Sequence, residues 1–172
     1  MNGMFYKAYS FNQSLDSWDV SKVTIMECMF CSAFEFNQPL EQWDVGNVTN
    51  MDGMFREANK FNQPLGEWNV SKVISMMFMF WEASSFNQPL DKWDVSSLKF
   101  IDWMFYKASL FNQPLNSWDV SSVISMLNMF EEAESFDKSN VLWYDWNNKI
   151  KIYDHNYNCL LYTSDAADDN AG

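Results

Sequence analysis

A repeat with a fixed period of 25 residues constrains the fold of this chain more than any other feature. The tripeptide Phe-Asn-Gln recurs in strict register, beginning at Phe11, Phe36, Phe61, Phe86 and Phe111, and an isolated Phe136 keeps the same period. No insertion or deletion interrupts these five units. A constant period of about 20 to 50 residues is typical of solenoids, in which each unit stacks on its neighbours. The sequence therefore predicts a repeat array.

Two hydrophobic periodicities alternate within each unit. In the first half, apolar residues stand at Leu40, Trp43 and Val45, and this stretch ends in the alternation of a short strand with one buried face. In the second half, apolar residues recur at steps of three and four, which indicates one face of a helix. In the second unit these are Val48, Met51, Met54, Phe55, Ala58 and Phe61. The predicted N-caps of the helices are Ser21, Ser71, Ser96 and Ser121, with Gly46 in one unit.

These patterns predict an α/β fold, a leucine-rich-repeat-like right-handed solenoid of 25-residue coils, each with a short parallel strand and a short helix. Equivalent strands of consecutive coils would stack about 4.8 Å apart. The stretch Leu40-x-x-Trp43-x-Val45-x-x-Val48 follows the leucine-rich-repeat spacing, with tryptophan in a leucine position. A recurring asparagine is assigned a structural role, because stacked amides can satisfy backbone groups of the coil. Its members are Asn12, Asn37, Asn62, Asn87 and Asn112.

The repeat also sets the predicted domain boundaries. The solenoid covers 1–148, with a half unit at 1–10, full units from residues 11, 36, 61, 86 and 111, and a degenerate unit from 136. Met1 falls in mid-repeat, which we interpret as the start of a fragment. Residues 149–158 alternate in the manner of an edge strand and form a possible cap, although a shifted reading frame would look the same. Residues 159–172 resemble a translated sequencing adapter and are expected to be non-native.

Composition and motifs exclude several classes of function. The formal charge of −12 argues against nucleic-acid binding, which needs a basic face. No apolar run reaches the roughly 18 residues of a membrane span. The only histidine, His155, lies outside the regular units, so they offer no histidine-based triad or zinc motif. Cys28-x-x-Cys31 lacks a second pair and is a weak zinc signal. We therefore expect no enzymatic activity, no cofactor and no metal.

An acidic column recurs just after the tryptophan of each unit. Its members are Asp19, Asp44, Asn69, Asp94 and Asp119. Like charges on adjacent strands repel unless a bound calcium ion, a cationic partner or backbone N–H groups offset them. Local capping is the interpretation we favour, since Asp-Val-Ser precedes the predicted helices and Asn69 replaces an aspartate in one unit.

The columns where the units disagree are the candidates for a binding site. A repeat keeps the residues that its packing requires, so the varied positions are free to specialise. On two adjacent predicted helical faces these positions become aromatic, and the predicted patch is Phe78, Trp81, Phe100, Trp103 and Tyr106. An exposed aromatic patch of this kind marks a protein or ligand site, whereas burial under adjoining loops is the alternative.

The repeated residues also carry a family resemblance. The pattern Phe-Asn-Gln-Pro-Leu-x-x-Trp-Asp-Val-Ser-x-Val-x-x-Met-x-x-Met-Phe-x-x-Ala resembles the repeat of BspA-like leucine-rich-repeat surface proteins, which also occurs in mycoplasma lipoprotein-associated proteins. The resemblance covers residues 1 to about 143 and implies an extracellular or surface-displayed array that acts in adhesion or protein binding, with no catalytic residues. We therefore predict a non-enzymatic interaction module. The alternative is a carbohydrate-binding module with Trp81, Trp103 and Tyr106 as stacking platforms.

Overall fold

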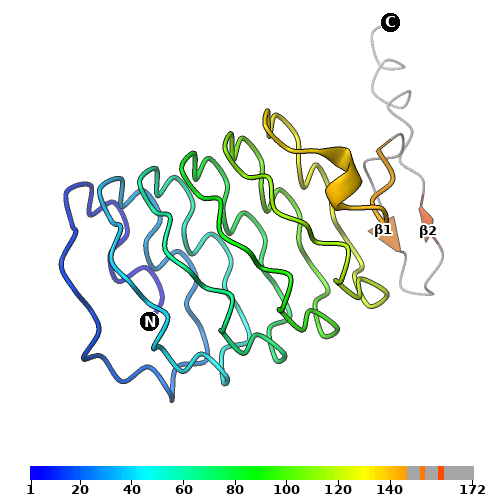
Figure 1. The fold of residues 1–172 in the computed structure, drawn as a ribbon. Coiled ribbons are helices and arrows are strands. Elements are labelled where there is room, and N and C mark those ends of the chain that lie inside the picture. Colours follow the sequence, from blue (N-terminus) through cyan, green and yellow to red (C-terminus); the bar gives the residue numbers. More distant parts are fainter. Residues whose placement is uncertain (147–151, 154–158, 161–172) are drawn as a thin grey trace, which may run out of the picture.

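The chain winds into a row of similar coils that lie side by side, from the N terminus to the degenerate unit (Figure 1). The computed structural model describes residues 1–146, 152–153 and 159–160. Its regular elements are the 3-10 helix η1 (Lys138–Asn140) and the strands β1 (Ile152–Tyr153) and β2 (Cys159–Leu160). The two strands pair antiparallel, with Ile152 opposite Leu160 and Tyr153 opposite Cys159.

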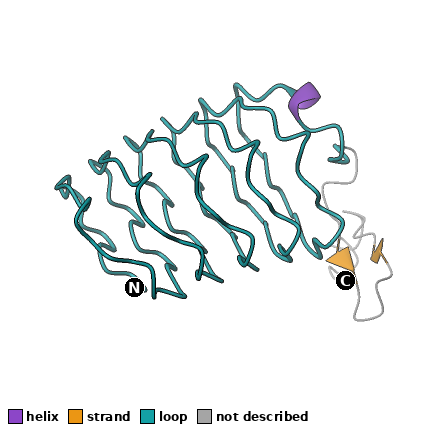
Figure 2. Ribbon diagram, turned by 60° about the horizontal axis from the view of Figure 1, so that its bottom comes forward, coloured by secondary structure: helices purple, strands orange, loops and turns teal. Residues whose placement is uncertain are grey.

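The predicted α/β coil, with one strand and one helix, is therefore wrong. Within the described residues the coils contain neither element and consist of turns and loops (Figure 2). In the stretch predicted to be helical, N–H groups donate to carbonyls three residues earlier, as from Met54 to Met51 (3.2 Å) and from Ala58 to Phe55 (3.0 Å). Consecutive turns also bring every third residue to the same side, so they produce the same apolar period as a helix. The predicted N-caps accordingly have no helix to cap.

Alternate N–H groups of this turn segment point along the solenoid axis. Met51, Gly53, Phe55 and Glu57 each donate to a carbonyl of the following coil, at 2.7–3.0 Å. The carbonyls of Asn50, Asp52, Met54 and Arg56 accept from the preceding coil in the same way. Two positions in each segment have positive φ, as Gly53 (59°) and Glu57 (58°) do in this coil. A positive φ at the third residue of a turn is what type II turns require.

Coil spacing gives the physical reason why no helix forms. The ring centroids of Phe30, Phe55, Phe80 and Phe105 lie 5.5–5.7 Å apart from coil to coil. On other sides of the coil, the column of Phe61 and Phe86 has a spacing of 6.1 Å, and that of Trp93 and Trp118 has 6.3 Å. An α-helix with its side chains is about 10 Å wide, so helices in successive coils would overlap at every one of these positions.

The strand predicted at Leu40 to Val45 is also absent, and the pairing between coils lies elsewhere. Single parallel bridges connect Ile25, Asn50, Ser75, Phe100 and Ser125. On the side of the predicted strand, side chains make the connections. The Oδ1 atom of Asn37 accepts the backbone N–H of Asn62 at 2.9 Å, and equivalent bonds run along the whole asparagine column. These bonds confirm the structural role predicted for these asparagines.

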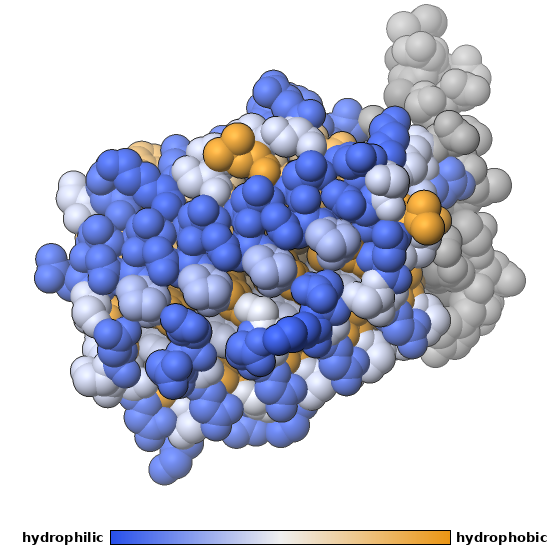
Figure 3. All heavy atoms as spheres, in the orientation of Figure 1, coloured by the Kyte–Doolittle hydropathy of each residue, from blue (hydrophilic) through white to orange (hydrophobic). Residues whose placement is uncertain are grey.

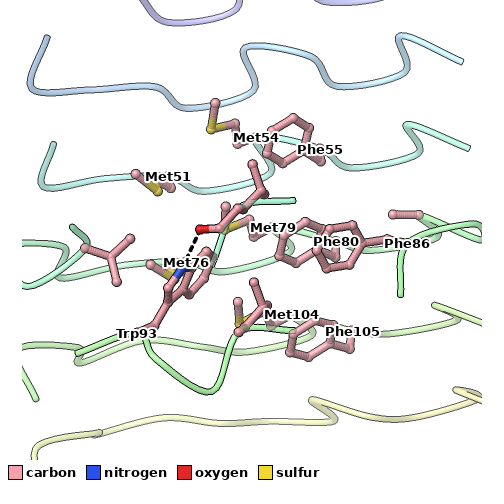
Figure 4. Close-up of a cluster of buried hydrophobic side chains, with 14 of the residues drawn as sticks. Met51, Met54, Phe55, Met76, Met79, Phe80, Phe86, Trp93, Met104 and Phe105 are labelled. Carbon is pink, nitrogen blue, oxygen red and sulfur yellow. Dashed lines mark hydrogen bonds between the residues drawn. The ribbon is translucent and has the colours of Figure 1, made fainter. Parts of the chain in front are cut away.

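The core is a continuous strip inside the coils. Met76, Met79 and Phe80 lie between their equivalents in the neighbouring coils (Figure 4), and all three are fully buried. The tryptophans of the repeat also bond between coils, and the Nε1–H of Trp93 donates to the Leu65 carbonyl at 2.9 Å. A buried indole N–H needs such a partner, and the leucine carbonyl of the preceding coil supplies it.

Packing changes in the degenerate unit. Tyr144 is buried and its ring meets that of Phe130 edge-on at 5.3 Å, while Trp146 packs against the same phenylalanine at 5.8 Å. The predicted cap at 149–158 and tail at 159–172 lie outside the described residues, except for the backbone of β1 and β2. Their assignment stays a prediction.

Candidate binding site

The turn segments of the coils place the predicted aromatic patch on one side of the solenoid. Phe78 and Trp103 occupy a column whose residues all have positive φ, and Trp81 and Tyr106 lie three residues further along. The patch forms a strip across neighbouring coils, called here the aromatic strip: Phe78, Trp81, Phe100, Trp103 and Tyr106. Phe100 is exposed and the other four are half-buried, so their side chains reach the surface. The face of the molecule shown in Figure 3 is mainly hydrophilic, with hydrophobic residues in separate places.

Trp81 is enclosed between residues of the two adjacent coils. The guanidinium carbon of Arg56 lies 4.2 Å from the centroid of the Trp81 ring, which is a close cation–π contact. From the following coil, Tyr106 stacks on Trp81 with centroids 5.5 Å apart and planes inclined by 15°. Because it is covered from both neighbouring coils, Trp81 has no free ring face for a sugar to stack on. Arg56 was not among the predicted site residues.

Trp103 lies between two surface hollows and lines both of them. The first, of about 250 Å³, is the Arg56 hollow, and its other lining residues are Arg56, Phe78, Trp81 and Tyr106. The second, of about 420 Å³, is the Phe100 hollow, and its other lining residues are Met77, Phe100, Asp102, Ser125 and Leu127. Trp103 meets Tyr106 edge-on, at 5.1 Å and 72°. Its ring is thus open to a ligand from either hollow.

Asp102 places a carboxylate in the wall of the Phe100 hollow. Its Oδ1 accepts the backbone N–H of Leu127 at 2.8 Å and also a hydrogen bond from the Ser125 hydroxyl. Asp52 makes the equivalent bonds to Met77 and Ser75 two coils earlier. Sequence reasoning missed the buried Asp102 and the half-buried Asp52, although their spacing of 50 residues was a signal for a role linked to the repeat.

A third hollow, of about 530 Å³, contains the Cys28-x-x-Cys31 pair. Burial raises the pKa of the Cys28 thiol to about 11, and burial also raises the pKa of Cys31. Both cysteines are free, and at neutral pH they are protonated thiols, which are poor nucleophiles. The Arg56 side chain lines both this third hollow and the Arg56 hollow, and it therefore lies between them.

The acidic column forms local turns. The Oδ1 of Asp94 accepts the backbone N–H of Ser96 at 3.1 Å and its hydroxyl at 2.7 Å. The other members accept the equivalent backbone bond at 3.0–3.2 Å: Asp19, Asp44, Asn69 and Asp119. Bonds from the serine two residues on lower the pKa of Asp19, Asp94 and Asp119. Each side chain thus caps its own turn and not a helix.

Two further features concern the described part of the chain. No group of three or more His, Cys, Asp or Glu side chains gathers there in a way that could hold a metal ion. The same residues include no helix with the length and apolar character needed to cross a membrane.

The coils and their variable outer strip define a repeat protein, a solenoid in which each 25-residue coil contacts only its neighbours. The chain belongs to the family described as Mycoplasma protein of unknown function, DUF285, whose model matches residues 1–85, 39–143 and 65–165. Overlapping matches are the result expected when one pattern recurs along a sequence. No curated protein and no solved structure matches the chain.

Proposed function

We propose that this solenoid is a non-enzymatic protein-binding module and that the aromatic strip is its contact surface. The observation that carries the proposal is the position of Trp103, a large aromatic side chain open to two adjacent hollows. Tryptophan and tyrosine that line shallow pockets supply much of the binding energy at protein interfaces. The resemblance to BspA-like surface proteins supports display outside the cell and a role in adhesion.

Carbohydrate binding is the second candidate, and the enclosure of Trp81 weighs against it. A sugar platform needs a free aromatic face, and the contacts of Arg56 and Tyr106 cover Trp81. The lining of the Phe100 hollow is mainly apolar, with Met77, Phe100 and Leu127 around Trp103. Such a hollow suits the apolar side chain of a partner protein better than the hydroxyl groups of a saccharide.

A parallel screen tests this function. The 172-residue protein and its Trp103→Ser variant are each presented to a displayed library of random peptides and to a glycan array. We expect peptides that bind the wild type and lose binding to Trp103→Ser. Leu110→Ser is the matched control, because Leu110 is 54% exposed, lies outside the strip and has serine in its column at Ser85 and Ser135.

The two candidates predict opposite results in this screen. Saccharide binding that disappears in Trp103→Ser, with no enriched peptides, would replace the protein-binding proposal by the carbohydrate one. Binding that is equal in the wild type and in Trp103→Ser would exclude the aromatic strip as the contact surface.

A further inference from the structure

The charges next to the aromatic strip restrict the partner that it can accept. Four carboxylates adjoin the strip or its cations: Asp102, Glu57, Glu82 and Glu132. Asp102 lies in the wall of the Phe100 hollow, and Glu132 accepts a hydrogen bond from the Tyr106 hydroxyl at 2.7 Å. Two cations, Arg56 and Lys107, lie against the Trp81 and Tyr106 rings of the strip. The strip therefore has an excess of negative charge at its borders.

Both cations already have partners within the protein. The Lys107 Nζ lies 3.6 Å from Glu82, 3.7 Å from Glu132 and 5.0 Å from the Tyr106 ring centroid. The guanidinium of Arg56 covers Trp81, and its Nε lies 3.4 Å from a Glu57 oxygen. An acidic partner would have to compete with these contacts and face four carboxylates, whereas a basic partner would meet complementary charge.

The Phe100 hollow sets the second requirement for the partner. It is bounded by the side chains of Met77, Phe100, Trp103 and Leu127, and Asp102 is the only charged residue in its lining. Its volume of about 420 Å³ can take one large apolar side chain. Burial of such a side chain next to an aromatic ring is favourable, because it removes apolar surface from water.

We infer that the partner is a protein segment with a large apolar or aromatic side chain flanked by lysine or arginine. The apolar side chain enters the Phe100 hollow against Trp103, and the flanking cations lie next to the solvent-accessible carboxylates of Glu82 and Glu132. This inference rests on the proposed protein-binding function. It adds the chemistry of the partner, which the function alone does not specify.

The residue composition of the selected peptides tests the inference. Peptides that bind the wild type, but not Trp103→Ser, are sequenced and compared with the unselected library. We expect enrichment of Leu, Met, Phe or Trp with Lys or Arg within a few positions. Binding of the best peptide to the wild-type protein is then measured by calorimetry at low and high NaCl. It should weaken several-fold as the salt shortens the screening length from about 30 Å to about 3 Å.

A charge variant gives an independent measurement. In the double variant Glu82→Gln, Glu132→Gln, the glutamine carbonyl still accepts the bond from Tyr106, but two negative charges are removed. The selected peptide should bind at least about threefold more weakly, whereas Leu110→Ser should leave its affinity unchanged. Trp103-dependent peptides that are neutral or acidic, or whose affinity is insensitive to salt and to this variant, would overturn the inference and leave the proposed function standing. A library with no Trp103-dependent peptide would overturn both.

Discussion

The two sides of each coil are joined to their neighbours by different chemical groups. On the side of the turn segments, from residue 50 to residue 57, backbone N–H and carbonyl groups make the bonds between coils. On the opposite part of the repeat, side chains make them, through the asparagine Oδ1 and the tryptophan Nε1. Where side chains make the bonds, the residue must stay the same from coil to coil. Where the backbone makes them, the outward side chains are free to differ, and this is the side on which the aromatic strip lies.

The largest expected effect is on the side-chain-bonded side, at the tryptophan in the middle of the array. Trp68 is buried, and its Nε1–H donates to the Leu40 carbonyl at 3.0 Å. Trp68→Ala should destabilise the protein by about 3 to 5 kcal/mol, because it leaves a cavity and an unpaired carbonyl. Chemical denaturation measures the change. Trp143→Ala, at the half-buried end of the column, should cost clearly less, and equal losses would contradict a core that is continuous through the coils.

A smaller loss is expected from the asparagine column. The Oδ1 of Asn62 accepts from the Asn87 N–H at 2.9 Å and from the Gln88 Nε2 at 3.0 Å. Asn62→Ala should reduce the free energy of unfolding by about 1 to 3 kcal/mol, because both donors lose their acceptor. Asn62→Asp keeps an acceptor in place and should retain most of the stability. If both variants unfold at the same denaturant concentration, side chains do not join the coils on this side.

On the backbone-bonded side, the expected effect depends on conformation. Gly53 has a φ of +59°, and a Cβ added there would lie 3.2 Å from the Cys28 Sγ. Gly53→Ala should therefore cost about 1 to 2 kcal/mol in thermal or chemical denaturation. The reverse change in the same column, Phe78→Gly, should stay within about 1 kcal/mol of the wild type, because the positive φ suits glycine. A large loss in Phe78→Gly would mean that the strip contributes to stability as much as the core does.

The smallest effect is expected at the acidic column. Each member already accepts a backbone hydrogen bond within its own turn, as Asp44 does from Gly46 at 3.0 Å. Millimolar calcium should raise the melting temperature by less than about 2 °C, since a ligand stabilises only through a site in the native state. Thermal melts with and without chelator measure the shift. A shift several times larger that the chelator abolishes would make this column a calcium site.

The repeat and its buried columns could be predicted from the sequence, but the local structure could not. The inward positions of Met51, Met54, Phe55 and Ala58 follow from their apolar period, and all four are fully buried. Helices and chains of turns share a period near three, so the pattern alone does not separate them. The expected strand spacing of about 4.8 Å was itself a signal against helices, since it is half the width of one.

The candidate site could also be predicted in part from the repeat. Variation among the repeats singled out Trp103 and its aromatic neighbours without any knowledge of the backbone. The positive φ of the column that holds Phe78 and Trp103 could also have been predicted. Glycine occupies that column in two units, at Gly3 and Gly53, and glycine favours positive φ. The stacking of Arg56 on Trp81 depends on the distance between adjacent coils and had no signal in the sequence.

The turn segments also give the solenoid an electrical direction. Four aligned peptide units in each coil, such as those that begin at Asn50, Asp52, Met54 and Arg56, have the carbonyl toward the preceding coil and the N–H toward the following one. Their dipoles add along the axis, as they do in a helix. Fewer backbone bonds have the opposite direction, as from Thr49 to Thr24 and from Lys60 to Phe34, and they do not cancel the four aligned units. One edge of a coil therefore presents these carbonyls, and the other edge presents these N–H groups. A two-fold axis would bring two identical edges together, acceptor to acceptor or donor to donor. Coils can thus associate through these groups only head to tail.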